Sequence, residues 1–155
     1  MSTTATWKKT TNSYGETEEL AARLGNNLHG GEVIELVSDL GGGKTTFTRG
    51  MVRGTGSTEQ VGSPSFTISK EYKAPKFTVA HFDFYRLSEA GVVGAELAEV
   101  VTDPSYVTVI EWGDIVHDVL PERRLTVNLT RVGDESRSIV LSYPSELAYI
   151  VEGLE

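Results

Sequence analysis

The chain has 155 residues, of which 39% are hydrophobic and 23% charged, and a formal net charge of −8 from 14 basic and 22 acidic side chains. This length fits a single domain, residues 1–155, that buries roughly 70% of the surface of its unfolded chain. Cysteine is absent, which excludes disulfides and thiolate metal sites. No apolar run approaches the ~18 residues of a membrane span, and residues 1–11 lack the apolar core of a signal peptide, so we expect a cytoplasmic protein without membrane contact.

The negative net charge also argues against direct binding of nucleic acid through the overall field of the protein. The basic doublets are Lys8-Lys9 and Arg123-Arg124, and a solvated surface explains either pair more simply than an RNA contact. We therefore expect any nucleic-acid partner to be bound only indirectly, through other proteins.

The N-terminal residues predict a strand, a helix and a second strand. Residues 5–11 favour a short edge strand, and Ser13 and Glu16 then have the spacing of a capping box. Apolar residues of the helix recur at helical spacing: Leu20, Ala21, Leu24 and Leu28. Residues 29–31 (His-Gly-Gly) end this helix, and the apolar run 33–37 predicts a buried strand.

Residues 41–46 read Gly-Gly-Gly-Lys-Thr-Thr, between that strand and a helix expected from Lys44 to about residue 53. This is the order of a P-loop, in which backbone N–H groups surround phosphates, an exposed loop lysine reaches the β- and γ-oxygens and the threonine hydroxyl binds Mg²⁺. The pattern places glycine at position 38, where this chain has Ser38, so we expect a local difference in loop geometry. The alternative is a flexible glycine turn at the end of a strand.

The rest of the chain continues the alternation of strands and helices. Glycines mark a loop over about residues 54–65. The elements expected after it are hairpin strands over 66–72 and 77–82, a helix over 89–101, a buried strand over 106–110, hairpin strands over 125–132 and 138–143, and a C-terminal helix with Ser145 as its N-cap. This order favours a three-layer α/β fold with a mixed sheet, of the P-loop NTPase type.

Two carboxylates, Asp83 and Glu111, each follow a predicted strand. Ligands of open α/β sheets bind at the carboxyl ends of strands, so both are candidates for binding metal or orienting a nucleophile. The alternative for each is a strand-terminal carboxylate that caps the next helix or faces solvent. His81 has no metal-ligand spacing, and we expect it to be a packed or surface histidine.

Ser63 and Ser65 flank a proline just before a predicted strand, as in loops that sense a γ-phosphate through Mg²⁺. An ordinary Ser-Pro turn explains this segment equally well. The chain contains no N-K-x-D segment that would read guanine, which favours ATP over GTP, and no G-x-S-x-G elbow, so serine-hydrolase chemistry has no support.

Four segments together resemble, in order, motifs of the bacterial TsaE family, the small ATPase of tRNA threonylcarbamoyladenosine biosynthesis: residues 40–50, 63–67, 81–87 and 110–112. The resemblance runs over roughly residues 13–140. It implies a P-loop α/β fold, ATP and Mg²⁺ as cofactors, and a modification of the adenosine beside the anticodon of tRNAs that decode ANN codons. It also implies two protein partners that form a heterodimer, the threonylcarbamoyl-transferase subunit and its inactive paralogue.

The resemblance assigns roles to individual residues as well. The ATP-binding set that it implies is Thr17, Leu40, Gly41, Gly42, Gly43, Lys44, Thr45 and Thr46. The implied metal ligands are Thr45, Glu111 and Asp83, and the implied catalytic residues are Lys44, Asp83 and Glu111. Ser65 stands where the family usually has threonine, and it keeps a hydroxyl for the switch-like loop.

We therefore predict an ATPase that resets a tRNA-modifying complex, with two alternatives. A small-molecule kinase would use the same P-loop but needs a lid that carries arginines. Arg123, Arg124 and Arg131 are the candidates for those arginines, but the predicted elements leave few residues to form a lid. A nucleotide-dependent binding module would bind ATP without productive turnover. These three functions are distinguished by ADP release from the protein alone, from the protein with the heterodimer and from the protein with small metabolites.

Overall fold

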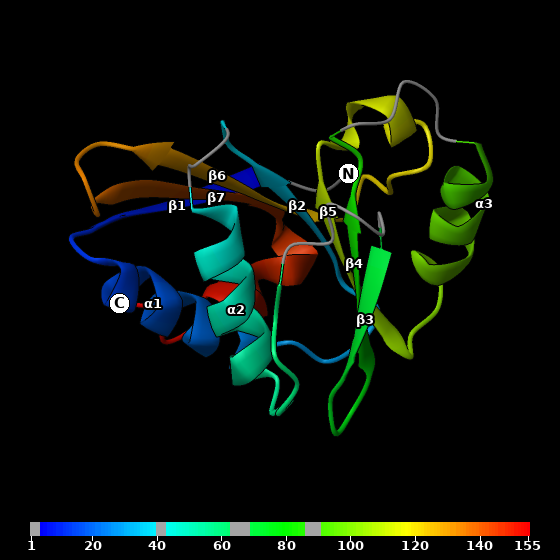
Figure 1. The fold of residues 1–155 in the computed structure, drawn as a ribbon, viewed down its shortest axis with the longest axis horizontal. Helices are drawn as coiled ribbons and strands as arrows, with labels where there is room; N and C mark the ends of the chain where they lie inside the picture. The colour runs from blue at the N-terminus through cyan, green and yellow to red at the C-terminus, as the bar shows by residue number, and fades with distance from the viewer. Residues whose placement is uncertain (1–3, 40–42, 63–68, 86–90) are drawn as a thin grey trace.

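The computed structural model describes residues 4–39, 43–62, 69–85 and 91–155. A mixed sheet of seven strands forms its centre, in the order β1-β7-β6-β2-β5-β4-β3 (Figure 1). The strands are β1 (Thr4–Thr11), β2 (Val33–Val37), β3 (Ser69–Lys73), β4 (Thr78–Asp83), β5 (Tyr106–Glu111), β6 (Leu125–Arg131) and β7 (Arg137–Pro144). The strands β6, β2, β5 and β4 pair in parallel in that order, whereas β7, β1 and β3 are antiparallel to their neighbours.

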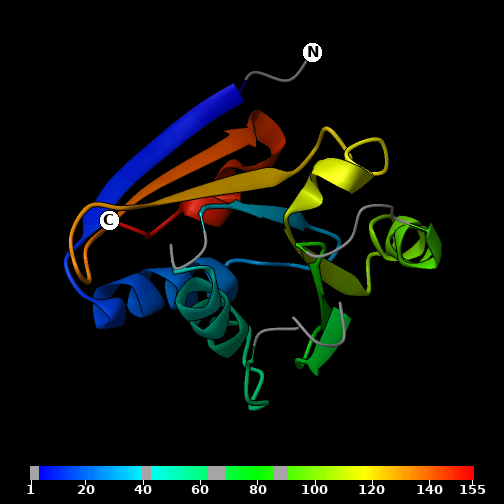
Figure 2. The ribbon, with the colours of Figure 1, turned by 45° about the horizontal axis from the view of Figure 1, so that its top comes forward.

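Helices cover both faces of this sheet. They are α1 (Tyr14–Asn26), α2 (Lys44–Gly54), α3 (Gly91–Val100) and two 3₁₀-helices, η1 (Gly113–Val116) and η2 (Ser145–Val151). The helices α1, α2 and η2 share one apolar core with Val79 and Val107, while α3 and η1 share another with the alternate residues Ala80 and Ile110. Figure 2 shows α1 and α2 together on one side of the sheet. The expected α/β fold with a mixed sheet in a single domain is therefore confirmed, and no described helix is long and apolar enough to span a membrane.

The predicted capping box starts α1. The Ser13 hydroxyl accepts a hydrogen bond from the N–H of Glu16 at 3.1 Å, as the sequence predicts. The Glu16 carboxylate accepts from the N–H of Asn12 at 3.3 Å, one residue earlier than in the usual reciprocal pair. Both side chains thus satisfy backbone N–H groups at the start of the helix.

Glycines bring α1 and α2 into close contact. A Cβ atom at Gly50 of α2 would lie 2.1 Å from the carbonyl oxygen of Glu18, and one at Gly25 of α1 would lie 2.0 Å from that of Met51. No side-chain atom fits at such distances from a backbone oxygen. Because α2 begins at Lys44, this contact also determines where the helix presents its first turn.

The C-terminal segment forms the 3₁₀-helix η2, so the expected N-cap is wrong. Pro144 precedes the helix, Ser145 is its first residue, and no side chain caps it. Leu147 and Ile150 are buried and three residues apart, a spacing that suits either helix type, so the apolar pattern could not separate them.

A buried carboxylate attaches η2 to the loop before β2. Glu32 accepts hydrogen bonds from the backbone N–H groups of His29 at 2.8 Å and Gly30 at 2.7 Å, and from the hydroxyl of Tyr149 at 2.5 Å. Burial, and then the hydrogen bond to Glu32, raise the pKa of the Tyr149 hydroxyl.

The parallel strands bring the predicted acidic residues to one edge of the sheet. Glu111, at the end of β5, is paired in register with Leu36 of β2 on one side and with Asp83 of β4 on the other. The chain leaves β2 at this same edge and enters α2 at Lys44. Lys44, Asp83 and Glu111 therefore converge where ligands of open α/β sheets bind.

Candidate functional site

The first turn of α2 is open to an anion. Gly43, the N-cap, has φ +103°, a left-handed conformation that favours glycine, and it offers no side chain to the free N–H groups of the turn. Thr45 and Thr46 in this turn are half-buried. These N–H groups and the helix dipole fit a phosphate. Three residues of the predicted phosphate-binding set lie outside the described residues: Leu40, Gly41 and Gly42.

Lys44 is buried, with 7% of its surface exposed, so the expectation of an exposed loop lysine is wrong. It is the first residue of α2, and its Nζ donates to the carbonyl oxygens of Ser38 at 3.2 Å and Asp39 at 3.3 Å. The Nζ also lies 5.0 Å from the centroid of the Trp112 ring. The side chain folds back along the loop because these acceptors and this ring surround its ammonium group.

The backbone at Ser38 needs no glycine. Among the described non-glycine residues, Trp112 has a positive φ, of 56°, and Ser38 does not. The Ser38 hydroxyl donates to the carbonyl oxygen of Asp39 at 2.8 Å. Serine therefore takes the place of the first P-loop glycine without left-handed backbone strain.

The two predicted carboxylates have different surroundings. Glu111 is buried, and its Oε2 lies 2.5 Å from Nε2 of His81, so the expected packed histidine contacts a candidate metal ligand. Asp83 is half-buried and accepts a hydrogen bond from the N–H of Tyr85 at 3.0 Å. Burial raises the pKa of Asp83, the Tyr85 hydrogen bond opposes this, and the nearby Glu111 charge raises it further.

The oxygen groups at this edge fit Mg²⁺. Thr45, Asp83 and Glu111 offer a hydroxyl and two carboxylates, the hard ligands that Mg²⁺ prefers. Among the described residues, no three acidic or imidazole side chains gather around one point. A nucleotide-bound Mg²⁺ needs only one or two protein carboxylates, because phosphates and water supply its other ligands.

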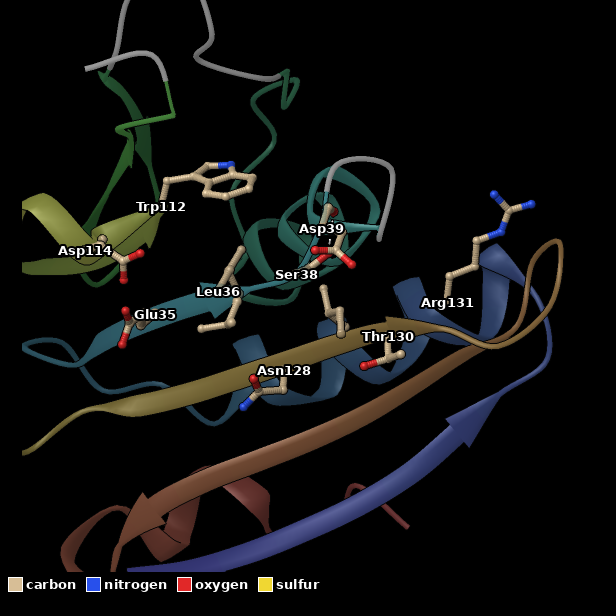
Figure 3. A pocket seen from close by; sticks show the side chains of 12 residues that line it. Glu35, Leu36, Ser38, Asp39, Trp112, Asp114, Asn128, Thr130 and Arg131 are labelled. Atoms are coloured by element: carbon tan, nitrogen blue, oxygen red, sulfur yellow. Dashed lines mark hydrogen bonds between the residues drawn. The ribbon is translucent and has the colours of Figure 1, made fainter. Parts of the chain in front are cut away.

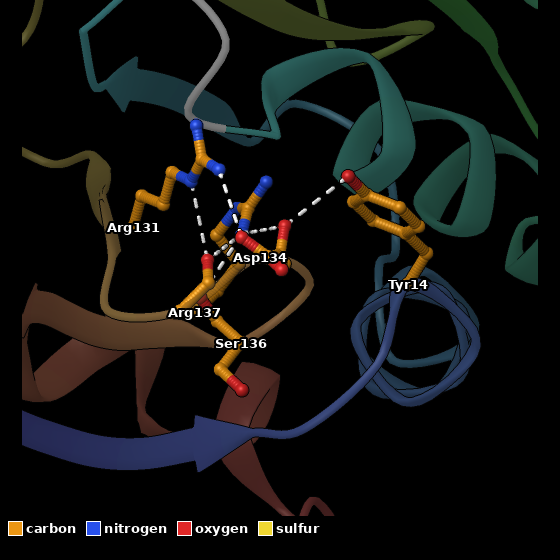
Figure 4. A network of polar contacts seen from close by, with 6 residues as sticks. Tyr14, Arg131, Asp134, Ser136 and Arg137 are labelled. Atoms are coloured by element: carbon orange, nitrogen blue, oxygen red, sulfur yellow. Dashed lines mark hydrogen bonds and ion pairs between the residues drawn. The ribbon is translucent and has the colours of Figure 1, made fainter.

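A cationic side chain that sequence reasoning missed lies beside the first turn of α2. Arg137 is buried, and a Cβ atom at Gly43 would lie 3.2 Å from its Nε. Its guanidinium donates to the carbonyl oxygens of Gly133 and Ser136 and lies 5.4 Å from the centroid of the Tyr14 ring (Figure 4). In the sequence, Arg137 is only an arginine near a hairpin turn, and no motif marks it.

The structure buries Thr17, for which the resemblance implies a place near the nucleotide base. Its hydroxyl is 2.6 Å from that of Thr11, and its side chain is fully buried. Tyr14, one turn earlier in α1, is 46% exposed and donates from its hydroxyl to the carbonyl oxygen of Asp134. The role of Thr17 stays a prediction, and Ser63 and Ser65 of the switch-like loop lie outside the described residues.

A cavity of about 530 Å³ adjoins the start of the P-loop on the face of the sheet opposite α2. Figure 3 shows Trp112 on one side of it and β6 on the other. Its polar and charged lining includes Glu35, Ser38, Asp39, Asp114, Asn128 and Arg131. Glu35 is paired with Arg124, whose Nε donates to its carboxylate at 3.1 Å.

Comparisons with known proteins agree with this architecture. The family described as "Threonylcarbamoyl adenosine biosynthesis protein TsaE" matches residues 11–139. The chain is 35% identical over 131 residues to the tRNA threonylcarbamoyladenosine biosynthesis protein TsaE of Bacillus subtilis, which covers 82% of this chain and 79% of that protein. The protein of the same name from Treponema pallidum is 33% identical over 130 residues, which covers 84% of this chain and 96% of that protein.

The fold is also similar to a solved structure. The crystal structure of Bacillus subtilis YdiB superposes with a TM-score of 0.82 at 32% sequence identity, and the match covers 98% of this chain and 95% of that one. The family match extends from the end of β1 into β7 and so includes the strand ends and the helix α2 that form the site. The chain therefore belongs to the TsaE family of tRNA threonylcarbamoyladenosine biosynthesis proteins.

Proposed function

We propose that this protein binds and hydrolyses ATP with Mg²⁺ and serves as the ATPase of the tRNA threonylcarbamoyladenosine machinery. One observation supports the chemistry above all others. The open N-terminus of α2, with Lys44 beside it, lies at the same sheet edge as the carboxylates of Asp83 and Glu111. A phosphate-binding turn next to two acidic side chains is the arrangement that phosphoryl transfer to water requires. The cytoplasmic location expected from the sequence is part of this proposal.

In this proposal the N–H groups of the first turn of α2 bind the phosphates of ATP. Lys44 exchanges its bonds to the carbonyl oxygens of Ser38 and Asp39 for the phosphate oxygens, since a charged acceptor binds an ammonium group more strongly than a neutral carbonyl does. Arg137, which borders Gly43, adds positive charge next to the phosphates.

The metal would be bound by the hydroxyl of Thr45 and the carboxylate of Glu111, and it would neutralise charge on the β- and γ-phosphates. Asp83 lies beside Glu111 in the sheet and retains its proton more readily than an exposed aspartate. It would contribute to the metal site or orient the attacking water.

The partners that we propose are the threonylcarbamoyl-transferase subunit and its inactive paralogue. With a net charge of −8, the chain is unsuited to gripping tRNA by itself, so the heterodimer would bind the tRNA and the ATPase would dock on the heterodimer. Binding and hydrolysis of ATP would then control docking through the loop that contains Ser63 and Ser65.

The test measures ADP release by the protein alone and with the purified heterodimer, with and without Mg²⁺. We expect slow Mg²⁺-dependent release that the heterodimer stimulates. Filter binding of labelled tRNA to the isolated chain should detect no micromolar complex at physiological salt. Failure to bind ATP would refute the chemistry, and co-elution with the heterodimer that is the same in ADP and in an ATP analogue would refute nucleotide-controlled docking.

The cavity beside the P-loop is the observation that favours a second candidate, a small-molecule kinase. Its volume, about 530 Å³, would accommodate an acceptor, and Arg131 lines it. Arg131 is, however, 61% exposed and paired with Asp134. Stimulation of ADP release by a small metabolite, and not by the heterodimer, would favour this function.

A further inference from the structure

The imidazole of His81 and the carboxylate of Glu111 form a buried pair at the candidate metal site. Their side chains are 1% and 5% exposed, and Nε2 of His81 lies 2.5 Å from Oε2 of Glu111. In the parallel register of β4 and β5, His81 is paired with Val109, two residues before Glu111. The two side chains are therefore diagonal neighbours on one face of the sheet.

The chemistry of this pair determines how the proton is shared. An ionised carboxylate only accepts hydrogen bonds, so the contact with an ionised Glu111 corresponds to the His81 tautomer that has its proton on Nε2. The other ring nitrogen, Nδ1, is buried and has no partner among the described residues. Within the part of the chain that the structure describes, the imidazole thus has a single hydrogen bond, and that bond is to Glu111.

The contact uses only one oxygen of the carboxylate. Oε2 of Glu111 accepts from His81, while no described residue donates to Oε1. A buried carboxylate with one oxygen in a hydrogen bond loses rotational freedom about its terminal torsion and presents the second oxygen in a defined direction. Such a carboxylate is prepared to bind a cation before the cation arrives.

We propose that His81 is a positioning residue for magnesium: its Nε2–H holds Oε2 of Glu111, which leaves Oε1 for the Mg²⁺ that accompanies ATP. This inference rests on the proposed function, since it assigns His81 a task in the same site. Partners that orient a metal ligand typically contribute 10–100-fold to metal affinity or activity, which sets the scale of the expected effect.

Three substitutions separate positioning from mere packing. His81→Gln keeps a donor at nearly the position of Nε2, His81→Asn moves the donor to the position of Nδ1, and His81→Phe keeps the ring without a donor. The dissociation constant for ADP is measured by calorimetry over a series of Mg²⁺ concentrations and again in EDTA, and each variant is melted to establish its fold.

We expect the Asn and Phe variants to need roughly 10–100-fold more Mg²⁺ for half-maximal tightening of ADP binding, and the Gln variant to stay within a few-fold of the parent. ADP affinity in EDTA should change less than about twofold in all three variants, because without Mg²⁺ the orientation of Glu111 does not affect nucleotide binding. Long-range ¹H–¹⁵N spectra of the metal-free parent should show the His81 proton on Nε2.

Several results would overturn the inference. One is an unchanged Mg²⁺ requirement in folded Asn and Phe variants, and another is an equal loss of ADP affinity with and without metal. A proton on Nδ1 of His81 would also overturn it. Unfolding of the Gln variant would mean that the pair of His81 and Glu111 is purely structural. If the Phe variant alone fails to fold, the comparison of Gln with Asn decides. A parent that binds no nucleotide, or binds it without regard to Mg²⁺, refutes the proposed function instead.

Discussion

Replacing Gly50 with alanine should destabilise the protein, although helix propensity alone predicts the reverse. Alanine is favoured over glycine in a helix interior by about 1 kcal/mol. The new Cβ atom, however, would lie 2.1 Å from the carbonyl oxygen of Glu18, where ordinary contacts begin at 3.4 Å. The obstacle is backbone on the facing helix, which no change of rotamer can move away.

The cost follows from how far the helices must separate. To lengthen the contact from 2.1 Å to 3.4 Å, α1 and α2 must move apart by roughly 1.3 Å, and the core around Phe47 and Met51 would lose part of its packing. Overpacking of this kind costs about 1–3 kcal/mol, and a poorly filled core costs a similar amount again. After the gain of about 1 kcal/mol in helix propensity, we expect a net loss of about 3 kcal/mol, which corresponds to roughly 6–12 °C in melting temperature at this size.

The assay is urea unfolding followed by circular dichroism. Gly15→Ala is the matched control, because this glycine lies in the first turn of α1 and its Cβ would meet only the Ser13 hydroxyl, at 3.7 Å. That variant should be as stable as the parent or gain up to about 1 kcal/mol. Because α2 begins with the turn for which we propose phosphate binding, Gly50→Ala should also weaken nucleotide binding. A Gly50→Ala protein as stable as the parent would refute the reasoning.

Three further predictions concern single side chains. Lys44→Met should lower ATP affinity at least tenfold while the melting temperature changes little, because methionine keeps much of the buried stem of the lysine and removes its charge. Unchanged ATP affinity in a nucleotide titration would contradict the P-loop assignment. Asp83→Ala and Glu111→Ala should each reduce the rate of ATP hydrolysis far more than the ATP affinity measured at saturating Mg²⁺, because metal binding and water orientation matter most in the transition state. Parental rates of hydrolysis in both variants would remove their assigned roles. As the pH rises above 10, the parent should lose stability more steeply than Tyr149→Phe. The folded state raises the pKa of the Tyr149 hydroxyl and keeps it protonated beside Glu32, whereas the unfolded chain ionises near 10. Parallel stability profiles of the two proteins against pH would argue against that hydrogen bond.

Local patterns in the sequence were sufficient for most of the helices and strands and for the position of two candidate site residues. The strand over residues 33–37 and the helix that begins at Lys44 follow from a short apolar run, a glycine-rich turn and a lysine, all close together in the chain. The capping pair Ser13 and Glu16 is equally local. Asp83 and Glu111 were identifiable because each ends a strand, and parallel strands bring their carboxyl ends to one edge.

Only the tertiary structure decided which side chains surround that edge. His81 and Glu111 are 30 residues apart, yet the parallel register of β4 and β5 makes them a buried pair. Arg137, at the start of β7, lies beside Gly43. Trp112, which follows β5, lies against the ammonium group of Lys44 and helps to bury it. Periodicity within a segment reports which face of that segment is apolar, but it contains no information about which distant residue the sheet places against it. For that physical reason the two strand-end carboxylates could be located from the chain, and their surroundings could not.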